Sequence, residues 1–319
     1  LTLYMITSFF KTSKPIHYII FLIVLICLFV YQRIIIVNYQ GNLSNTLNEI
    51  GDLLILLASF FTLIFIVTKN NLTYNNGYAA LYFCLFIGLI PSCLEENSIL
   101  LSNLFILLSF RRIMSLKTNS NIKKKLLDAS MWICLAAIFE PWAILFFLVL
   151  FFGMVFYSVT QIKNTMIPFC GILAVAILLT SYRLLTENAF PSVTEFLPTL
   201  RFDNPSFNNT ITKTESLQFL AVVLFGIVSF FGKVVLKNRL KIPSVFVILL
   251  AILIGITMVF INSNHGASRY YLFAFAPTSI ILANFSETTM YRWLSDLVIG
   301  LLLFAVLIQW SLNISFLIN

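Results

Sequence analysis

The sequence predicts an all-α, polytopic transmembrane helical bundle, and three observations lead to this prediction. Hydrophobic residues make up 60% of the 319 residues, charged residues make up only 10%, and the mean hydropathy is +0.98. Soluble domains usually carry about 25% charged residues. Apolar runs recur along the whole chain with short polar segments between them, so we expect a single transmembrane domain over residues 1–319.

The apolar runs predict about eleven membrane-crossing helices. A crossing helix satisfies its own backbone hydrogen bonds in lipid and needs about 17–25 residues, although the runs at 98–110 and 126–139 are shorter. In chain order, we expect helices at residues 17–37, 53–68, 78–94, 98–110, 126–139, 143–159, 166–181, 217–231, 243–261, 270–285 and 293–317.

The basic stretch at residues 111–125 sets the predicted orientation. It contains six of the 20 Lys and Arg residues and no acid, so the positive-inside rule places it in the cytoplasm. Counting crossings from this stretch puts the N-terminus in the cytoplasm and the C-terminus outside. On this path the cytoplasmic side takes 15 of the 20 basic residues and the outer side takes 9 of the 12 acidic residues.

Two polar segments fall on the predicted outer side. The first is the loop at residues 38–51, and the second is a longer segment at 182–215, which we expect to form a folded cap. At the N-terminus, two lysines precede the first apolar run without a small-residue cleavage site after it, so we expect an uncleaved first span. Met5 would be a more usual first residue than Leu1, which leaves open whether residues 1–4 are native.

Glu49 and Asp52 are the first candidate functional pair. They are three residues apart, so they share a face if the second helix begins early enough to include them. A pair of carboxylates in this position could bind a divalent cation or act as a general base. The alternative is a solvated first helical turn, where acidic residues are favoured by the helix dipole.

Glu140 is the second candidate, because it precedes Pro141 and Trp142 at the end of a short apolar run. A carboxylate at a membrane boundary is costly and is often functional when it faces inward. The same motif also suits a plain outer turn, with Pro141 in the first helical turn and Trp142 at the membrane interface.

His265, Arg269 and Tyr270 form the third candidate group, at the outer end of the ninth and tenth predicted helices. Arginine suits bidentate recognition of a phosphate, and Arg201 in the predicted cap could assist. The alternative is that Arg269 pairs with one of the many outer acidic residues. We therefore treat these four residues as candidate substrate-binding residues.

Other chemistries find no support in the sequence. The basic residues lie in short segments beside apolar runs, where they set orientation, so we exclude nucleic-acid binding. The five cysteines show no metal-binding spacing, and nucleotide-binding and common hydrolase motifs are missing from the sequence. We predict no protein-held metal cluster, while a divalent cation bound by carboxylates stays open as a cofactor.

Two resemblances add expectations. The segments at residues 5–16, 69–73, 111–113 and 123–129 resemble an uncharacterised family of polytopic inner-membrane proteins from Bacteroidota, which implies a bacterial inner membrane. The acidic first outer loop, the long outer segment and the Arg-Tyr-Tyr at 269–271 are similar to C-type glycosyltransferases, which use polyprenyl-phosphate-linked sugars. That resemblance implies a base or metal ligand at Glu49 or Asp52 and a phosphate-binding role for Arg269. This sequence differs from that family in its first predicted outer loop, which is too short for the usual juxtamembrane helix.

Two functions follow as hypotheses. The first is an enzyme-like protein that handles a lipid-linked sugar or another lipid phosphate in an outer-facing cavity lined by carboxylates. The second is a non-catalytic membrane subunit of a cell-envelope complex for secretion, gliding or polysaccharide export, with membrane-protein partners.

Overall fold

The computed structural model describes residues 6–36, 43–74, 76–188, 210–237, 242–262, 267–289 and 292–318, and within these residues every regular element is a helix. In chain order these are α1 (Ile6–Phe10), α2 (Pro15–Tyr31), η1 (Gln32–Ile36), α3 (Leu43–Lys69), α4 (Tyr78–Leu89), η2 (Pro91–Leu94), α5 (Asn97–Met114), η3 (Ser115–Thr118), α6 (Ile122–Phe139), η4 (Pro141–Leu145), α7 (Phe146–Phe156), α8 (Ile162–Thr165), α9 (Ile167–Glu187), α11 (Thr210–Lys237), α12 (Ile242–Ile261), η6 (Ala267–Tyr271), α13 (Leu272–Thr288) and α14 (Arg292–Ile318).

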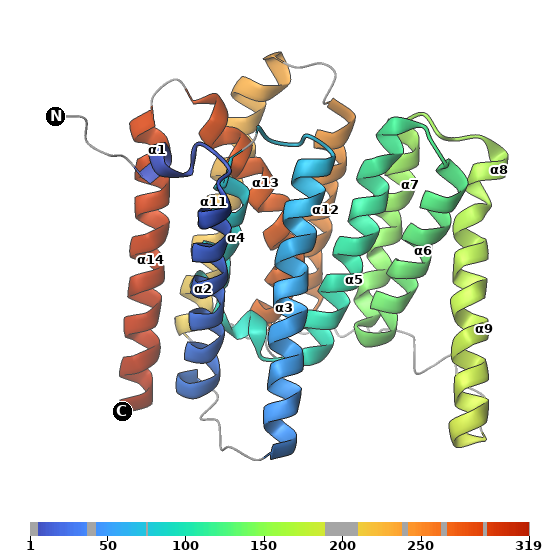
Figure 1. Cartoon of the computed structure of the whole chain (residues 1–319), viewed down its shortest axis with the longest axis horizontal. Helices are drawn as coiled ribbons and strands as arrows, with labels where there is room; N and C mark the ends of the chain where they lie inside the picture. The colour runs from blue at the N-terminus through green and yellow to red at the C-terminus, as the bar shows by residue number, and fades with distance from the viewer. Residues whose placement is uncertain are drawn as a thin grey trace.

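The long helices lie side by side and their connections gather at two opposite ends (Figure 1). The short helix α1 lies at the upper end in this view, whereas the last residues of α14 lie at the lower end. The upper end includes the turn at residues 119–121 that follows the basic part of α5. We call the upper end the basic end and the lower end the acidic end, where Glu49, Glu95 and Glu140 lie.

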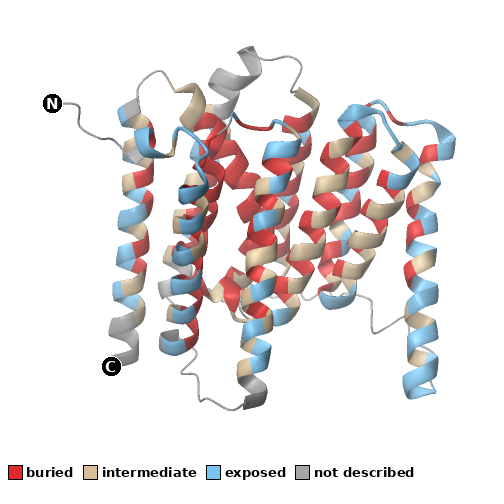
Figure 2. Cartoon of the chain, in the orientation of Figure 1, coloured by how far each residue is buried: buried red, intermediate tan, exposed pale blue. Residues whose placement is uncertain are grey.

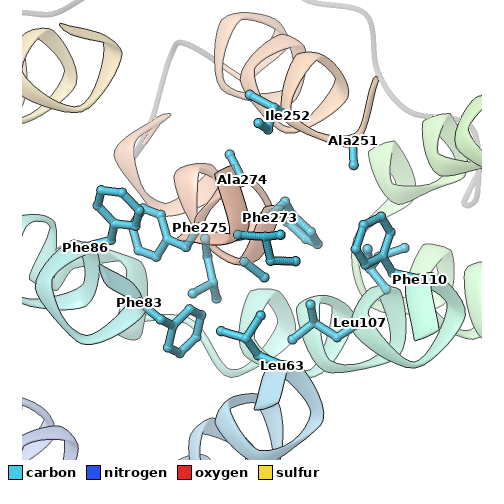
Figure 3. Close-up of a cluster of buried hydrophobic side chains, with 14 of the residues drawn as sticks. Leu63, Phe83, Phe86, Leu107, Phe110, Ala251, Ile252, Phe273, Ala274 and Phe275 are labelled. Carbon is cyan, nitrogen blue, oxygen red and sulfur yellow. The ribbon is translucent and has the colours of Figure 1, made fainter. Parts of the chain in front are cut away.

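Helices α4 and α13 form the centre of the bundle. Every residue of α4 is buried, and α13 is buried from Leu272 to Phe285, so both helices are surrounded by protein on all sides. Figure 2 shows this buried centre, with exposed residues mainly on the peripheral helices α2, α3, α9 and α14. A close-up of the centre shows Phe273 and Phe275 of α13 among side chains from α3, α4, α5 and α12 (Figure 3).

Six described helical segments are long and apolar enough to cross a membrane, which is consistent with a multi-pass membrane protein. They are Pro15–Ile34, Thr46–Lys69, Asn97–Thr118, Ile162–Glu187, Ile242–Ile261 and Trp293–Asn313. Three shorter apolar helices lie at Tyr78–Leu89, Pro141–Phe156 and Thr214–Ser229. The 12 residues of α4 reach about 18 Å, less than the roughly 30 Å of a bilayer core, because a helix rises 1.5 Å per residue.

Small residues allow two pairs of helices to approach closely. A Cβ added at Gly255 of α12 would lie 2.9 Å from the Cβ and 3.0 Å from the backbone N of Ala274 on α13. A Cβ at Gly171 of α9 would lie 1.9 Å from the Oγ of Ser130 on α6. Close contacts of this kind are typical of helix packing in membranes, where van der Waals contact replaces the hydrophobic effect.

The structure corrects several predicted boundaries. The predicted outer loop at 38–51 is helical from Leu43 onwards, so α3 begins well before residue 53. The predicted basic loop at 111–125 is mostly helical, because α5, η3 and α6 leave only residues 119–121 between them. The predicted cap at 182–215 is helical at both ends, where α9 extends to Glu187 and α11 begins at Thr210. Residues 189–209 of that segment lie outside the described part of the chain.

Candidate functional site

Arg33 organises the first half of a charge network at the acidic end. It lies in η1, a π-helical turn that continues α2, and π-helical turns are frequent at functional sites. Its guanidinium pairs with Glu49 and, at 2.8 Å, with Asp52 of α3. Its Nη1 also donates to the backbone carbonyl of Glu95 at 3.4 Å. Arg33 and Asp52 are both buried, so this is an ion pair removed from water.

The sequence prediction that Glu49 and Asp52 share a helical face is confirmed, because both lie on α3 and contact the same arginine. Arg33 itself was missed by the sequence analysis, which treated it only as the flank of an apolar run. A single arginine at the end of such a run is a usable signal, since a charge there needs a partner.

Arg269 organises the second half of the network. It lies in η6, between α12 and α13, and its Nη2 is 2.6 Å from Glu95. Its Nη1 pairs with Glu96. Arg269 thus pairs with two acidic residues, as in the alternative that the sequence analysis left open. Its Nε is buried without a hydrogen-bond partner. The backbone carbonyl of Glu95 also accepts a hydrogen bond from Arg33. The turn between η2 and α5 therefore connects the two halves of the network.

Glu140 and Tyr270 meet beside this second half. The hydroxyl of Tyr270 donates to Oε2 of Glu140 at 3.3 Å. Burial raises the pKa of Glu140, and a hydrogen bond from Tyr270 partly opposes this shift. Burial and the neighbouring carboxylate of Glu140 raise the pKa of Tyr270, so its hydroxyl stays protonated at neutral pH. This pair can therefore hold or transfer a proton at Oε2 of Glu140.

A further buried carboxylate lies at the same end. Glu215, near the start of α11, accepts a hydrogen bond of 2.8 Å from Nε2 of Gln309 on α14. Both residues are buried, and the sequence analysis selected neither as a site residue. Together with Glu49, Asp52, Glu95, Glu96 and Glu140, this makes six carboxyl groups against two guanidinium groups, an excess of four potential negative charges among these residues.

A metal ion fits this arrangement poorly. Among the described residues, no group of three or more His, Cys, Asp or Glu side chains could hold a metal ion. The carboxylates of Glu49 and Asp52 converge on Arg33, a permanent cation, where the sequence analysis had left a divalent cation open. We therefore derive no step that depends on a metal.

An apolar groove lies next to Glu140, between α6, η4 and α9. Two voids of about 410 and 480 Å³ share Ile138, Pro141, Val175 and Leu179 in their linings. The close contact between Gly171 and Ser130 limits the groove on the side of the basic end. The second void extends to Arg183 and Glu187 at the last turns of α9. The groove thus runs from apolar surface to the acidic end, where Pro141 directly follows Glu140.

Two predicted substrate-binding residues, Arg201 and His265, lie outside the described residues. Tyr270 contacts Glu140, and Arg269, its neighbour in η6, pairs with Glu95 and Glu96. Among the described residues, the pair Glu49 and Asp52 is linked to this group through Arg33 and Glu95. The candidate site therefore consists of two arginine-centred halves and not of one continuous cluster of catalytic groups.

The burial of Glu140 predicts a pH dependence of stability. The ionised carboxylate is less favourable in the fold than in the unfolded chain, where its pKa is about 4.5. The folded protein is therefore most stable, as far as Glu140 is concerned, below pH 4.5, where this carboxyl group is neutral. Its free energy of unfolding falls as the pH rises through the raised pKa of Glu140. We expect Glu140→Gln to lose less stability than the parent protein as the pH rises from 4.5 through the raised pKa of Glu140, measured by unfolding in detergent. Exposed Glu187→Gln is the matched control, and equal pH profiles for the parent and Glu140→Gln would contradict the prediction.

The fold and the site together define an all-helical protein, consistent with multiple membrane crossings, that carries a buried charge network at one end. Comparison with protein-family models gave no match, and neither curated proteins nor solved structures gave one.

Proposed function

We propose that the protein handles an amphiphile at the acidic end of the bundle, specifically a lipid-linked sugar or another lipid phosphate. The observation that carries this proposal is the apolar groove between α6 and α9, which is lined by Pro141, the residue directly after Glu140, and Glu140 is in turn bonded to Tyr270. Apolar clefts with a few polar groups at one end are typical of ligand sites. A lipid chain would lie in the groove and its headgroup would lie at the network.

The proposal includes the predicted topology. It has about eleven crossings of a bacterial inner membrane, the basic end in the cytoplasm and the acidic end outside. Support comes from the distribution of charge, because the basic stretch at residues 111–125 and the network around Arg269 lie at opposite ends of α5.

The residues divide into two roles under this proposal. Glu140 holds or accepts a proton from the headgroup, and Tyr270 orients its carboxylate by donating a hydrogen bond. Arg269 keeps an Nε donor without a partner, which suits one oxygen of a phosphate. Glu49 and Asp52 hold Arg33 and so position the turn that carries Glu95. This arrangement resembles C-type glycosyltransferases only in placing carboxylates and an arginine at the outer end.

A second candidate is a non-catalytic membrane subunit of a cell-envelope complex. One observation favours it: both arginines are already engaged by carboxylates, as expected of a charge network that holds helices together. In that case the exposed apolar faces of α9 and α14 would contact partner proteins.

A groove-filling variant tests the first proposal. We expect Leu179→Trp to reduce binding of a long-chain polyprenyl phosphate about tenfold or more, because the indole fills the space of the lipid chain. Leu173→Trp is the matched control, since Leu173 is exposed on the same helix and lines neither void. Binding is measured by native mass spectrometry of the protein released from nanodiscs.

The outcomes separate the two candidates. Binding that is lost in Leu179→Trp and kept in Leu173→Trp supports the amphiphile proposal. Equal binding by both variants and the parent protein, or binding by none of them, contradicts it. Under the subunit proposal, neither substitution changes polyprenyl phosphate binding, and both variants keep the stability of the parent protein.

A further inference from the structure

A second pocket lies at the basic end, far along the bundle from the charge network. Its volume is about 380 Å³, and all ten residues that line it have polar side chains: Thr7, Ser8, Lys11, Tyr74, Asn76, Tyr78, Ser286, Glu287, Thr289 and Ser295. In a chain that is 60% hydrophobic, a pocket lined only by residues with polar side chains requires an explanation. The size falls within the range of small-molecule sites.

Hydrogen bonds between distant parts of the chain build this pocket. The backbone N–H of Thr7 donates to Oδ1 of Asp296 at 2.8 Å, which ties α1 to the start of α14. The hydroxyl of Tyr78 donates to the carbonyl of Thr7 at 2.7 Å, which ties α1 to α4. The backbone N–H of Tyr74 donates to Oε1 of Glu287 at 3.0 Å, and Asn76 donates to the same oxygen. The walls are therefore fixed before any ligand binds.

Two acceptors have no hydrogen-bond partner, one on a residue that lines the pocket and one directly behind it. Thr7 is 3% exposed, and its Oγ1 has no hydrogen-bond partner although the residue lines the pocket. Behind it, Oδ2 of Asp296 is also buried without a partner. Leaving such groups unsatisfied in the interior is unfavourable, so a ligand that donates hydrogen bonds is favoured here.

The distribution of charge indicates which kind of donor fits. Among the acidic residues that the structure describes, only Asp128, Glu287 and Asp296 belong to helix ends on the basic side. Asp128 pairs with Arg112 at 2.7 Å, whereas Glu287 lines the pocket and Asp296 lies beside it, where it accepts the hydrogen bond from Thr7. Among the lining residues Lys11 is the one cation and Glu287 is the one carboxylate, and Asp296 adds a second carboxylate behind Thr7. The pocket is acceptor-rich at an end of the molecule that is otherwise basic.

We propose that this pocket binds a primary ammonium group, carried by a small polar molecule or by a lipid headgroup. Oγ1 of Thr7 and the carboxylate of Glu287 would accept hydrogen bonds from the ammonium, and the charge of Asp296 behind Thr7 would favour a cation. Lys11, on the same pocket, would then face any anionic group of the ligand, such as the phosphate of an ethanolamine lipid. This site is separate from the proposed amphiphile site and does not depend on it.

Ethanolamine and putrescine are the soluble probes, and ethylene glycol is the neutral probe of similar size. We expect both amines to raise the thermal unfolding midpoint of the detergent-solubilised protein in a saturable manner, whereas ethylene glycol does not. A second arm compares nanodiscs of phosphatidylethanolamine with nanodiscs of phosphatidylcholine. Stabilisation by free amines identifies a soluble ligand, and stabilisation only in phosphatidylethanolamine identifies a lipid headgroup.

The variants are Asp296→Asn and Thr7→Val, with Asp128→Asn as the matched control at the same end. The Asp296→Asn change keeps an oxygen for the N–H of Thr7 and removes the charge, so the pocket should still form. Either pocket variant should weaken amine binding about tenfold or more, while Asp128→Asn should leave it unchanged. The proposal is overturned if neither arm shows stabilisation of the parent protein. It is also overturned if all three variants respond as the parent does.

Discussion

Replacing Arg33 with methionine is expected to destabilise the folded protein by about 3–5 kcal/mol, because it leaves two carboxylates without their shared cation. The side chains of Arg33 and Asp52 are 9% and 6% exposed, so water cannot replace the lost partner. Removing one member of a buried pair is far more costly than removing the whole pair. The free energy of unfolding in mixed micelles, titrated with a denaturing detergent, measures this effect.

Two further variants make this result specific. Arg112→Met breaks the ion pair with Asp128, whose side chain is 34% exposed, and should cost less than about 1 kcal/mol. The triple change of Arg33→Met, Glu49→Gln and Asp52→Asn removes the buried charges together and should recover most of the lost stability. A loss in Arg33→Met no larger than that in Arg112→Met would show that Arg33 does not hold the acidic end together.

Replacing Gly255 with alanine is expected to destabilise the protein by about 1–3 kcal/mol, because the added methyl group overlaps α13. The new Cβ would lie 3.0 Å from the backbone N and 3.1 Å from the Cα of Ala274. Backbone atoms cannot rotate away as a side chain can. Because α13 is buried from Leu272 to Phe285, its displacement would disturb the packing of the whole centre of the bundle.

Gly300 provides the matched control for this substitution. It also lies within a long helix, α14, but a Cβ added there meets no atom within 4 Å. Gly300→Ala should therefore change stability by less than about 1 kcal/mol, in the stabilising direction, since alanine favours the helix. The same unfolding measurement serves for both variants. Equal stabilities for the two variants would show that α12 and α13 do not depend on close contact at Gly255.

The sequence predicted the helices well and their ends less well, for a physical reason. Apolar periodicity marks the part of a helix that contacts lipid or core, but a helix can continue through polar residues beyond it. The first turns of α3, which include Glu49, are polar, so the sequence analysis assigned them to a loop. Likewise Arg111 and Arg112 extend α5, because basic residues are compatible with the last turn of a helix.

The candidate site was predictable in its members but not in its pairing. Glu49, Asp52, Glu140 and Arg269 were selected from their types and positions, and each contributes to the network. The pairing of Arg269 with Glu95 and Glu96 depends on η2 and η6 lying side by side, although they are far apart in the chain. The sequence of either segment alone carries no signal for this contact. Arg33 was missed because its partners, Glu49 and Asp52, belong to the next helix, α3, and are distant from it in the sequence.

The orientation of the bundle is the claim on which the proposed function depends, and labelling of single cysteines tests it most directly. Asn97 and Ser120 are both exposed and lie just beyond opposite ends of the apolar part of α5. In a protein whose native cysteines have been replaced, a membrane-impermeant maleimide added to intact spheroplasts should label Asn97→Cys but not Ser120→Cys. Labelling of both positions from the same side, or of Ser120→Cys alone, would contradict the orientation and remove the basis for an outward-facing lipid site.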